Sequence, residues 1–145
     1  MPRPDNVGVG VAILIYDRKR KKVILLQRLG AHAEGTWACP GGWIDFEDAD
    51  PVATCLRELQ EEVNLTIDRK FLRLYTVVSE NHEDAGFKSV TLYYRVNWED
   101  ISMNVAPNFP QVVEPDKSSA VQWHSLNELP SPLFPQLEGV LKTLS

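Results

Sequence analysis

The sequence contains few cysteines, no long apolar run and no recognisable targeting segment. Cys39 and Cys55 form no C-x-x-C pair and have no companions for a zinc site, which favours a reducing compartment. The longest apolar run, residues 7–16, is too short to cross a bilayer, and the first residues show no signal-peptide pattern. We therefore expect a cytoplasmic protein with no membrane partner.

Basic residues are also in deficit. The chain has 15 Lys and Arg against 20 Asp and Glu, which gives a net charge of -5. A surface that grips a nucleic acid backbone needs the opposite balance, so we expect no nucleic acid polymer as a partner. An acidic protein can still bind a small anionic ligand when divalent cations lie between its carboxylates and the ligand oxygens.

The length of 145 residues and the 43% hydrophobic content fit one domain, residues 1–145, with no internal repeat. Runs of β-branched residues and apolar stripes alternate along the chain and predict an α/β fold with a mixed sheet. Strands are expected at residues 7–17, 22–28, 71–79, 88–98 and 121–125, and helices at residues 51–63, from 125 onwards and at 132–144.

Two connecting segments have no clear period. Residues 80–87 form a polar stretch that predicts a loop between two strands. Residues 97–120 contain three prolines, and their length indicates either an active-site loop or disorder. Beyond them, Ser125 and Glu128 form a capping box, which predicts the start of a helix.

The segment from Cys39 to Leu65 raises the main question about function. Asp50 and Pro51 are a strong helix start, and Asn64 suits the left-handed conformation that often ends a helix. An apolar stripe follows the helical period at Val52, Leu56, Leu59 and Val63.

Three acids lie on a different face of this predicted helix. At about 100° per residue, Glu58, Glu61 and Glu62 share one side, where their carboxylates repel each other. A divalent cation such as Mg²⁺ fits such a site, because it takes oxygen ligands and completes its shell with water and substrate phosphates. Without other signals, this charged run would more often be an exposed helix face.

Two glycines precede the helix and favour the metal-site interpretation. Gly41 and Gly42 let the backbone turn tightly and approach a ligand, leaving a carbonyl free for a cation or an amide free for a phosphate. We expect the helix, its acids and this turn to form one pocket.

These residues resemble the signature of the Nudix hydrolases. That signature has a glycine, five residues, a glutamate, seven residues and then Arg-Glu-apolar-any-Glu-Glu-any-Gly-apolar. Gly41 and Glu47 match the first part, and residues 57–65 match the second. The sequence departs from the pattern because nine residues separate Glu47 from Arg57, or eight if Asp48 is the loop acid with Gly42 as the glycine, and because Asn64 replaces the final glycine.

Most of the chain is similar to small Nudix nucleoside triphosphate pyrophosphatases of plants and animals. The similar segments are residues 3–13, 25–42 and 113–141. This resemblance implies an α/β/α sandwich and a Mg²⁺-dependent enzyme, with Mn²⁺ as a substitute, that cleaves a (deoxy)nucleoside triphosphate to nucleoside monophosphate and pyrophosphate. It also implies a small-molecule nucleotide as the partner and a homodimer as the assembly that this subgroup commonly forms.

The resemblance implies roles for individual residues. Glu58 and Glu62 would be principal metal ligands, Glu61 would serve a second ion or the attacking water, and the Gly41 carbonyl would complete a coordination sphere. Arg57 would orient a carboxylate.

Further residues are expected around the substrate. Arg28, Gly41 and Gly42 would contact phosphate, and Glu114 would help with the water, with Asp116 behind it. A base could stack on Trp37, Phe87, Phe109 or Trp123, although packing is the better interpretation for any one of them.

Two other functions remain open from the sequence. One is hydrolysis of ADP-ribose or another nucleoside-diphosphate-X compound, since loops rather than the metal site select the substrate. The other is a non-catalytic module that binds a nucleotide as a sensor. A binding module has no need to keep Glu58, Glu61 and Glu62 together, so the complete set favours an enzyme.

Overall fold

The computed structural model describes residues 7–30 and 34–145. Parts of two segments used for the resemblance, residues 3–6 and 31–33, lie outside the described residues. The strands are β1 (Val7–Asp17), β2 (Lys22–Arg28), β3 (Trp37–Ala38), β4 (Gly41–Trp43), β5 (Arg73–His82), β6 (Phe87–Asn97) and β7 (Ser118–Ser125). The helices are α1 (Pro51–Val63), α2 (Trp98–Ile101) and α3 (Leu137–Leu141), with 3-10 turns at Arg69–Phe71, Glu83–Ala85 and Ser102–Asn104.

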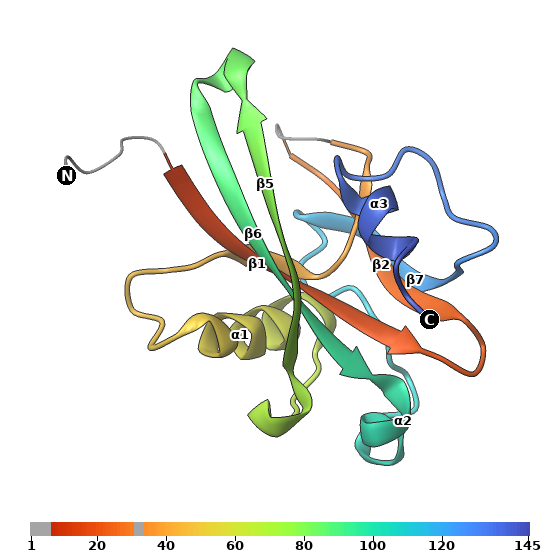
Figure 1. Ribbon diagram of the computed structural model, residues 1–145. Coiled ribbons are helices and arrows are strands. Elements are labelled where there is room, and N and C mark those ends of the chain that lie inside the picture. The colour runs from red at the N-terminus through yellow and green to blue at the C-terminus, as the bar shows by residue number, and fades with distance from the viewer. Residues whose placement is uncertain (1–6, 31–33) are drawn as a thin grey trace.

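The described strands form one mixed sheet (Figure 1). Its main path runs β3-β2-β1-β6-β5, with β4 paired to β1 and β7 paired to β2. β1 and β6 are parallel, whereas the other pairs are antiparallel. β4 occupies the edge of β1 along Gly10–Ala12, and β2 occupies the same edge further on, at Tyr16 and Asp17.

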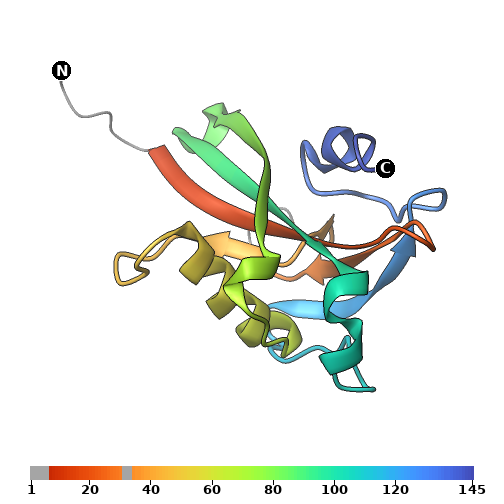
Figure 2. The same cartoon turned by 60° about the horizontal axis from the view of Figure 1, so that its bottom comes forward.

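The two faces of β1 carry separate cores, because successive side chains of a strand point to opposite sides. Val11, Ile13 and Ile15 pack with buried residues of α1, while Ala12 and Leu14 pack with buried residues of α3. Figure 2 shows α1 and α3 on opposite sides of β1. The predicted α/β/α sandwich with a mixed sheet is confirmed.

Helix α1 forms as the sequence predicts. The Asp50 carboxylate accepts a hydrogen bond from the Ala53 N–H at 2.8 Å, and Pro51 begins the helix. At the other end, Asn64 has a φ of 55° and its N–H donates to the Gln60 carbonyl at 3.2 Å. Both ends of the helix that carries the glutamates are therefore fixed locally.

The hairpin between β5 and β6 is longer than predicted. Residues 80–82 continue β5, and only the turn Glu83–Ala85 and Gly86 separate His82 from Phe87. The polar residues here still alternate between faces, and cross-strand pairing holds them in a strand. Half of the expected loop at residues 80–87 is thus strand.

The predictions for the C-terminal part are wrong in extent. The capping box at Ser125 forms only a turn, in which the Asn127 N–H donates to the Ser125 Oγ at 3.2 Å. Closely spaced prolines follow this turn and cannot supply the N–H groups that a helix needs. The final helix is correspondingly short, because α3 begins only after Pro135, at Leu137.

Residues 97–120 contain structure that the sequence did not indicate. The first part forms α2 and the turn Ser102–Asn104, and β7 begins already at Ser118. The intervening segment packs Val105 and Phe109 against the core on the α1 side of the sheet. Within the described residues, no helix combines the length and the apolar character that a membrane span requires.

The cap at Asp50 provides a test of the helix start. Asp50→Ala should lower the free energy of unfolding by about 1–2 kcal/mol, because the Ala53 N–H loses its partner. Asp50 also pairs with Arg69 at 2.7 Å, but both side chains are exposed, so Arg69→Ala should cost less than about 1 kcal/mol. Urea denaturation of both variants measures the difference, and equal losses would show that the ion pair, not the cap, supports the helix.

Candidate functional site

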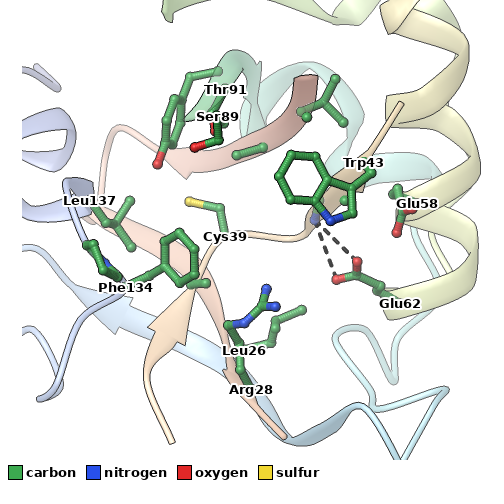
Figure 3. A pocket seen from close by; sticks show the side chains of 18 of the residues that line it. Leu26, Arg28, Cys39, Trp43, Glu58, Glu62, Ser89, Thr91, Phe134 and Leu137 are labelled. Atoms are coloured by element: carbon green, nitrogen blue, oxygen red, sulfur yellow. Dashed lines mark hydrogen bonds between the residues drawn. The ribbon is translucent and has the colours of Figure 1, made fainter. Parts of the chain in front are cut away.

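A pocket of about 740 Å³ lies on the α3 side of the sheet (Figure 3). Its floor comes from alternate residues of β5 and β6, including Val78, Glu80, Ser89, Thr91 and Tyr93. Figure 3 shows residues of α1 at one side of the pocket, with the C-terminal segment before and at the start of α3 on the other. The volume is within the range of small-molecule sites.

The backbone of β4 meets helix α1 at the edge of this pocket. Gly41 N–H donates to both carboxylate oxygens of Glu62, at 3.3 and 3.4 Å. A Cβ on Gly41 would lie only 2.1 Å from the Val11 carbonyl oxygen, so no other residue fits without moving β1 or β4. The close approach of β4 to β1 therefore fixes the amide that holds Glu62.

The second glycine makes room for Glu58. A Cβ on Gly42 would lie 2.5 Å from Glu58 Oε1 and 2.7 Å from its Cδ. Glu58 and Glu62 are one helical turn apart on α1, and both line the pocket (Figure 3). The turn thus places two carboxylates side by side against a backbone without side chains.

This contact changes the acidity of Glu62. Burial, followed by the hydrogen bond with Glu58 and the charge of Glu58, raises the pKa of Glu62 from 4.5 to about 9. Two carboxylates in contact cannot both ionise cheaply without a neighbouring positive charge. The pair is therefore an oxygen-rich site in which Arg57 contacts only Glu58, so the two carboxylates carry more negative charge than this one guanidinium balances.

Arg57 connects the helix to the loop before it. Its guanidinium donates to both oxygens of Asp48, at 3.1 and 2.9 Å, and to Glu58 Oε1 at 2.9 Å. The Asp48 side chain is only 9% exposed and also accepts from the Thr54 hydroxyl at 2.8 Å. The bonds from Arg57 hold the pKa of Asp48 well below its usual range. These contacts agree with the orienting role predicted for Arg57.

The loop acid in contact with Arg57 is Asp48 rather than Glu47. Glu47 is exposed, and Asp48 accepts the bonds that orient the arginine. The structure therefore favours the alignment in which Gly42 and Asp48 match the glycine and glutamate of the family signature.

Glu61 does not join the other two glutamates. Its side chain is 43% exposed and contacts Arg57 at 3.4 Å, and it is not among the residues that line the pocket. Over residues 7–30 and 34–145, no three acidic, histidine or cysteine side chains are close enough to hold one metal ion. The expected gathering of three carboxylates is thus a pair in this structure, and the roles predicted for Glu61 remain predictions.

The other predicted substrate and catalytic residues line the pocket. Arg28 projects from the end of β2, with its guanidinium carbon 5.1 Å from the centre of the Phe134 ring. Glu114 comes from the loop before β7 and pairs with Lys117 at 3.4 Å. The structure therefore brings Arg28 and Glu114 to the same pocket as Gly41 and Gly42, whereas Asp116 does not line it.

Only one of the four aromatic residues considered for base stacking lines the pocket. That residue is Phe87, which stacks on His82 with a centroid distance of 4.3 Å. Trp37, Phe109 and Trp123 pack against the two cores instead. For these three, the packing interpretation is correct.

Several other pocket residues were not predicted from the sequence. Trp43 is 54% exposed and Phe134 lies across the pocket from the glutamates (Figure 3). Glu80 was predicted to lie in a loop. Because it belongs to β5, where side chains alternate between the two faces of the sheet, it lies on the face that lines the pocket. Cys39 also lines the pocket, but burial raises the pKa of its thiol to about 12 and it forms no disulfide.

Comparison with known proteins identifies the family. The family model for the NUDIX domain matches residues 7–144. The chain belongs to the Nudix family. Its fold is also that of a MutT NUDIX hydrolase from Burkholderia pseudomallei, with a TM-score of 0.81, 27% identity, and coverage of 97% of this chain and 100% of that one.

One further relative was solved with ADP ribose, and another is named as a transcriptional repressor. The NUDIX domain of Shewanella oneidensis NrtR, solved with ADP ribose, matches with a TM-score of 0.69 and 24% identity over 97% of this chain and 86% of that chain. An ADPR responsive transcriptional repressor NtrR from Acinetobacter baylyi is 30% identical over 87 residues. That match covers 59% of this chain and 34% of the repressor, so this chain spans about a third of the length of that relative.

Nudix hydrolases generally use divalent cations such as Mg²⁺, and the residues present fit one. Mg²⁺ requires oxygen ligands, and the site offers two adjacent carboxylates from Glu58 and Glu62. Burial raises the pKa of Glu62 first, and the neighbouring Glu58 carboxylate raises it further, so a cation bound at the pair would favour the ionised form. Glu58 and Glu62 are accordingly the residues that would hold the ion.

The pair predicts an unusual effect of Glu62→Gln on stability. The pKa of Glu62 is raised in the folded state, so the metal-free protein loses stability as pH rises from about 4.5 towards 9. A glutamine does not titrate. The free energy of unfolding of the wild type should therefore fall, relative to that of Glu62→Gln, by at least about 1 kcal/mol as the pH rises from about 5 to about 8. Each pKa unit corresponds to about 1.4 kcal/mol.

Urea denaturation in the presence of EDTA measures this difference. Glu138→Gln, on the exposed face of α3, is the matched control and should follow the wild type at every pH. Parallel pH profiles for Glu62→Gln and the wild type would contradict the account of the carboxylate pair.

Proposed function

We propose that this chain is a Mg²⁺-dependent hydrolase that converts a (deoxy)nucleoside triphosphate to a nucleoside monophosphate and pyrophosphate. The observation that carries the proposal is the contact between Glu58 and Glu62 beside Gly41 and Gly42, at the edge of a pocket of nucleotide size. Two adjacent carboxylates that share one guanidinium are costly to keep ionised together, and a cation that also binds phosphates would lower this cost.

The residues around the pair have separate tasks in this proposal. Gly41 N–H and Arg57 hold Glu62 and Glu58 in place, which keeps both carboxylates ready to bind the ion. A divalent cation bound there would neutralise phosphate oxygens and lower the pKa of a bound water. Arg28 lines the same pocket and would pair with the phosphate chain.

Glu114 is our candidate for accepting the proton of the attacking water. It lies in the same pocket as the metal-site pair but on a different segment, so it can approach the phosphate chain from another side. Its ion pair with Lys117 fixes the carboxylate near the pocket wall. Glu61, being outside the pocket lining, is the weaker candidate for this role.

The proposed partner is a small nucleotide rather than a nucleic acid polymer. The net charge of -5 supports this choice, although one relative is named as a transcriptional repressor. The ADP ribose bound to the Shewanella relative makes ADP-ribose the main competing substrate. Both compounds contain a phosphoanhydride, so the same residues would serve either reaction.

The first test of the proposal is metal-dependent turnover. Wild-type protein should release pyrophosphate from nucleoside triphosphates in Mg²⁺ or Mn²⁺ and stop when EDTA is added. Glu58→Gln and Glu62→Gln should each lower kcat by about 100-fold or more, because groups outside the coordination shell already contribute 10–100-fold. Glu138→Gln should retain the wild-type rate.

A substrate panel that includes ADP-ribose belongs in the same assay. If the protein hydrolyses ADP-ribose but no nucleoside triphosphate, the proposed substrate is wrong, although the proposed metal site would still be correct. Nucleotide binding without any metal-dependent turnover would favour the sensor function instead.

A second test concerns the loop acid. Asp48→Asn should lower kcat by about 10–100-fold, because Arg57 loses the charged partner that aligns it with Glu58. Glu47→Gln, at the adjacent exposed position, should leave kcat unchanged. Steady-state kinetics of the two variants decide between the two acids. A loss of kcat in Glu47→Gln but not in Asp48→Asn would show that Glu47 is the loop acid.

A further inference from the structure

A second polar group lies in the pocket at a distance from the metal-site pair. Glu80 is on β5, half-buried, and lines the pocket through the strand face shared by Val78 and His82. Among residues 7–30 and 34–145, its carboxylate has no hydrogen bond and no ion pair. A pocket-lining carboxylate without a protein partner is available to accept hydrogen bonds from a ligand.

The strand register places Glu80 in a row that crosses the pocket floor. Glu80 is opposite Ser89 on β6, and Ser89 is opposite Gly8 on β1. The indole of Trp43 lies on Gly8, where an added Cβ would be 2.7 Å from its Cζ3 atom. Because neighbouring strands are about 4.8 Å apart, the backbones of Glu80 and Gly8 are separated by about two strand spacings, or roughly 10 Å.

The group that fits between Glu80 and Trp43 is flat and carries hydrogen-bond donors. Trp43 is 54% exposed, so part of its ring surface is available for stacking. Phe87 meets the edge of Trp43 at a centroid distance of 6.3 Å and stacks on His82, which extends the aromatic wall towards Glu80. His82 is itself fixed by a bond between its Nε2 and the Ser89 hydroxyl at 2.8 Å.

The chemistry of a carboxylate narrows the choice of base. An ionised carboxylate accepts hydrogen bonds and donates none. Guanine presents two adjacent N–H donors, at N1 and at the 2-amino group, which match the two carboxylate oxygens. Adenine and cytosine place a ring-nitrogen acceptor beside their amino group, and uracil and thymine offer a single N–H between two carbonyls.

We propose that Glu80 is a specificity-determining residue that recognises the donor edge of a guanine base. This inference rests on the proposed nucleotide hydrolase function, because it places the base at the β5–β6 side of the pocket and the phosphates at Glu58 and Glu62. Glu80 binds the base and takes no part in bond cleavage.

Steady-state kinetics of Glu80→Gln with dGTP, dITP and dATP test the inference. Hypoxanthine lacks the 2-amino group, so the wild type should prefer dGTP to dITP. The variant should lose about 10–100-fold in kcat/KM for dGTP, corresponding to a charge-assisted hydrogen-bond pair. The loss should come from KM with kcat nearly unchanged, because binding is removed equally from the ground and transition states.

The remaining substrates and a matched variant provide the controls. Glu83→Gln, on the exposed turn next to β5, should resemble the wild type with every substrate. Glu80→Gln should leave dATP turnover unchanged or raise it, which a general loss of folding would not do. Equal losses with dGTP, dITP and dATP would overturn the assignment to guanine.

Ribonucleotide substrates distinguish recognition of the base from recognition of the sugar. If Glu80 instead held the two hydroxyls of a ribose, Glu80→Gln would weaken GTP and ATP alike and spare dGTP. That result would also overturn the proposal.

Binding without turnover keeps this inference separate from the proposed function. Calorimetric titration of GMP and AMP should show that Glu80→Gln weakens GMP binding by about 10–100-fold and spares AMP. If the wild type hydrolyses no triphosphate but shows this GMP effect, the catalytic proposal fails and the role of Glu80 stands. If the wild type hydrolyses triphosphates but Glu80→Gln has the same base preference as the wild type, the catalytic proposal stands and the role of Glu80 fails.

Discussion

The contact between Glu58 and Glu62 is the constraint on which the rest of the site depends. Two carboxylates one turn apart on a helix would normally turn to solvent and separate. Here the Gly41 amide holds Glu62, Arg57 holds Glu58, and Gly42 leaves space for Glu58 against the β4 backbone. The fold therefore maintains a local excess of negative charge that a cation can relieve.

The sheet provides the rigidity that this arrangement requires. β4 runs along β1 so closely that a side chain at Gly41 would collide with the Val11 carbonyl, and the α1 core anchors the helix on the other side through Cys55, Leu59 and Val63. The same sheet offers its other face as the floor of the pocket. Strand β1 thus contacts both parts of the site. One of its faces packs against helix α1, which carries the glutamates, and its other face belongs to the sheet surface that forms the pocket floor.

The local signals in the sequence predicted the helix well, because capping and periodicity depend on neighbouring residues. Asp50, Pro51 and Asn64 act as expected, and so does the apolar stripe. The helical wheel placed Glu61 on one face with Glu58 and Glu62, but it could not show which of them line the pocket, because that depends on how other elements pack around the helix. The failures at Ser125 and at residues 80–87 have a related cause: strand pairing and proline placement override local propensity.

A crystal structure of the protein with Mn²⁺ and a non-hydrolysable nucleoside triphosphate analogue, using the anomalous signal of the metal, tests the role of the Glu58–Glu62 pair. We expect a Mn²⁺ ion bonded to carboxylate oxygens of both Glu58 and Glu62, with the phosphates of the analogue in the same pocket. An ion bound elsewhere, or a nucleotide seated in the pocket with these two carboxylates still in contact only with each other, would contradict this role.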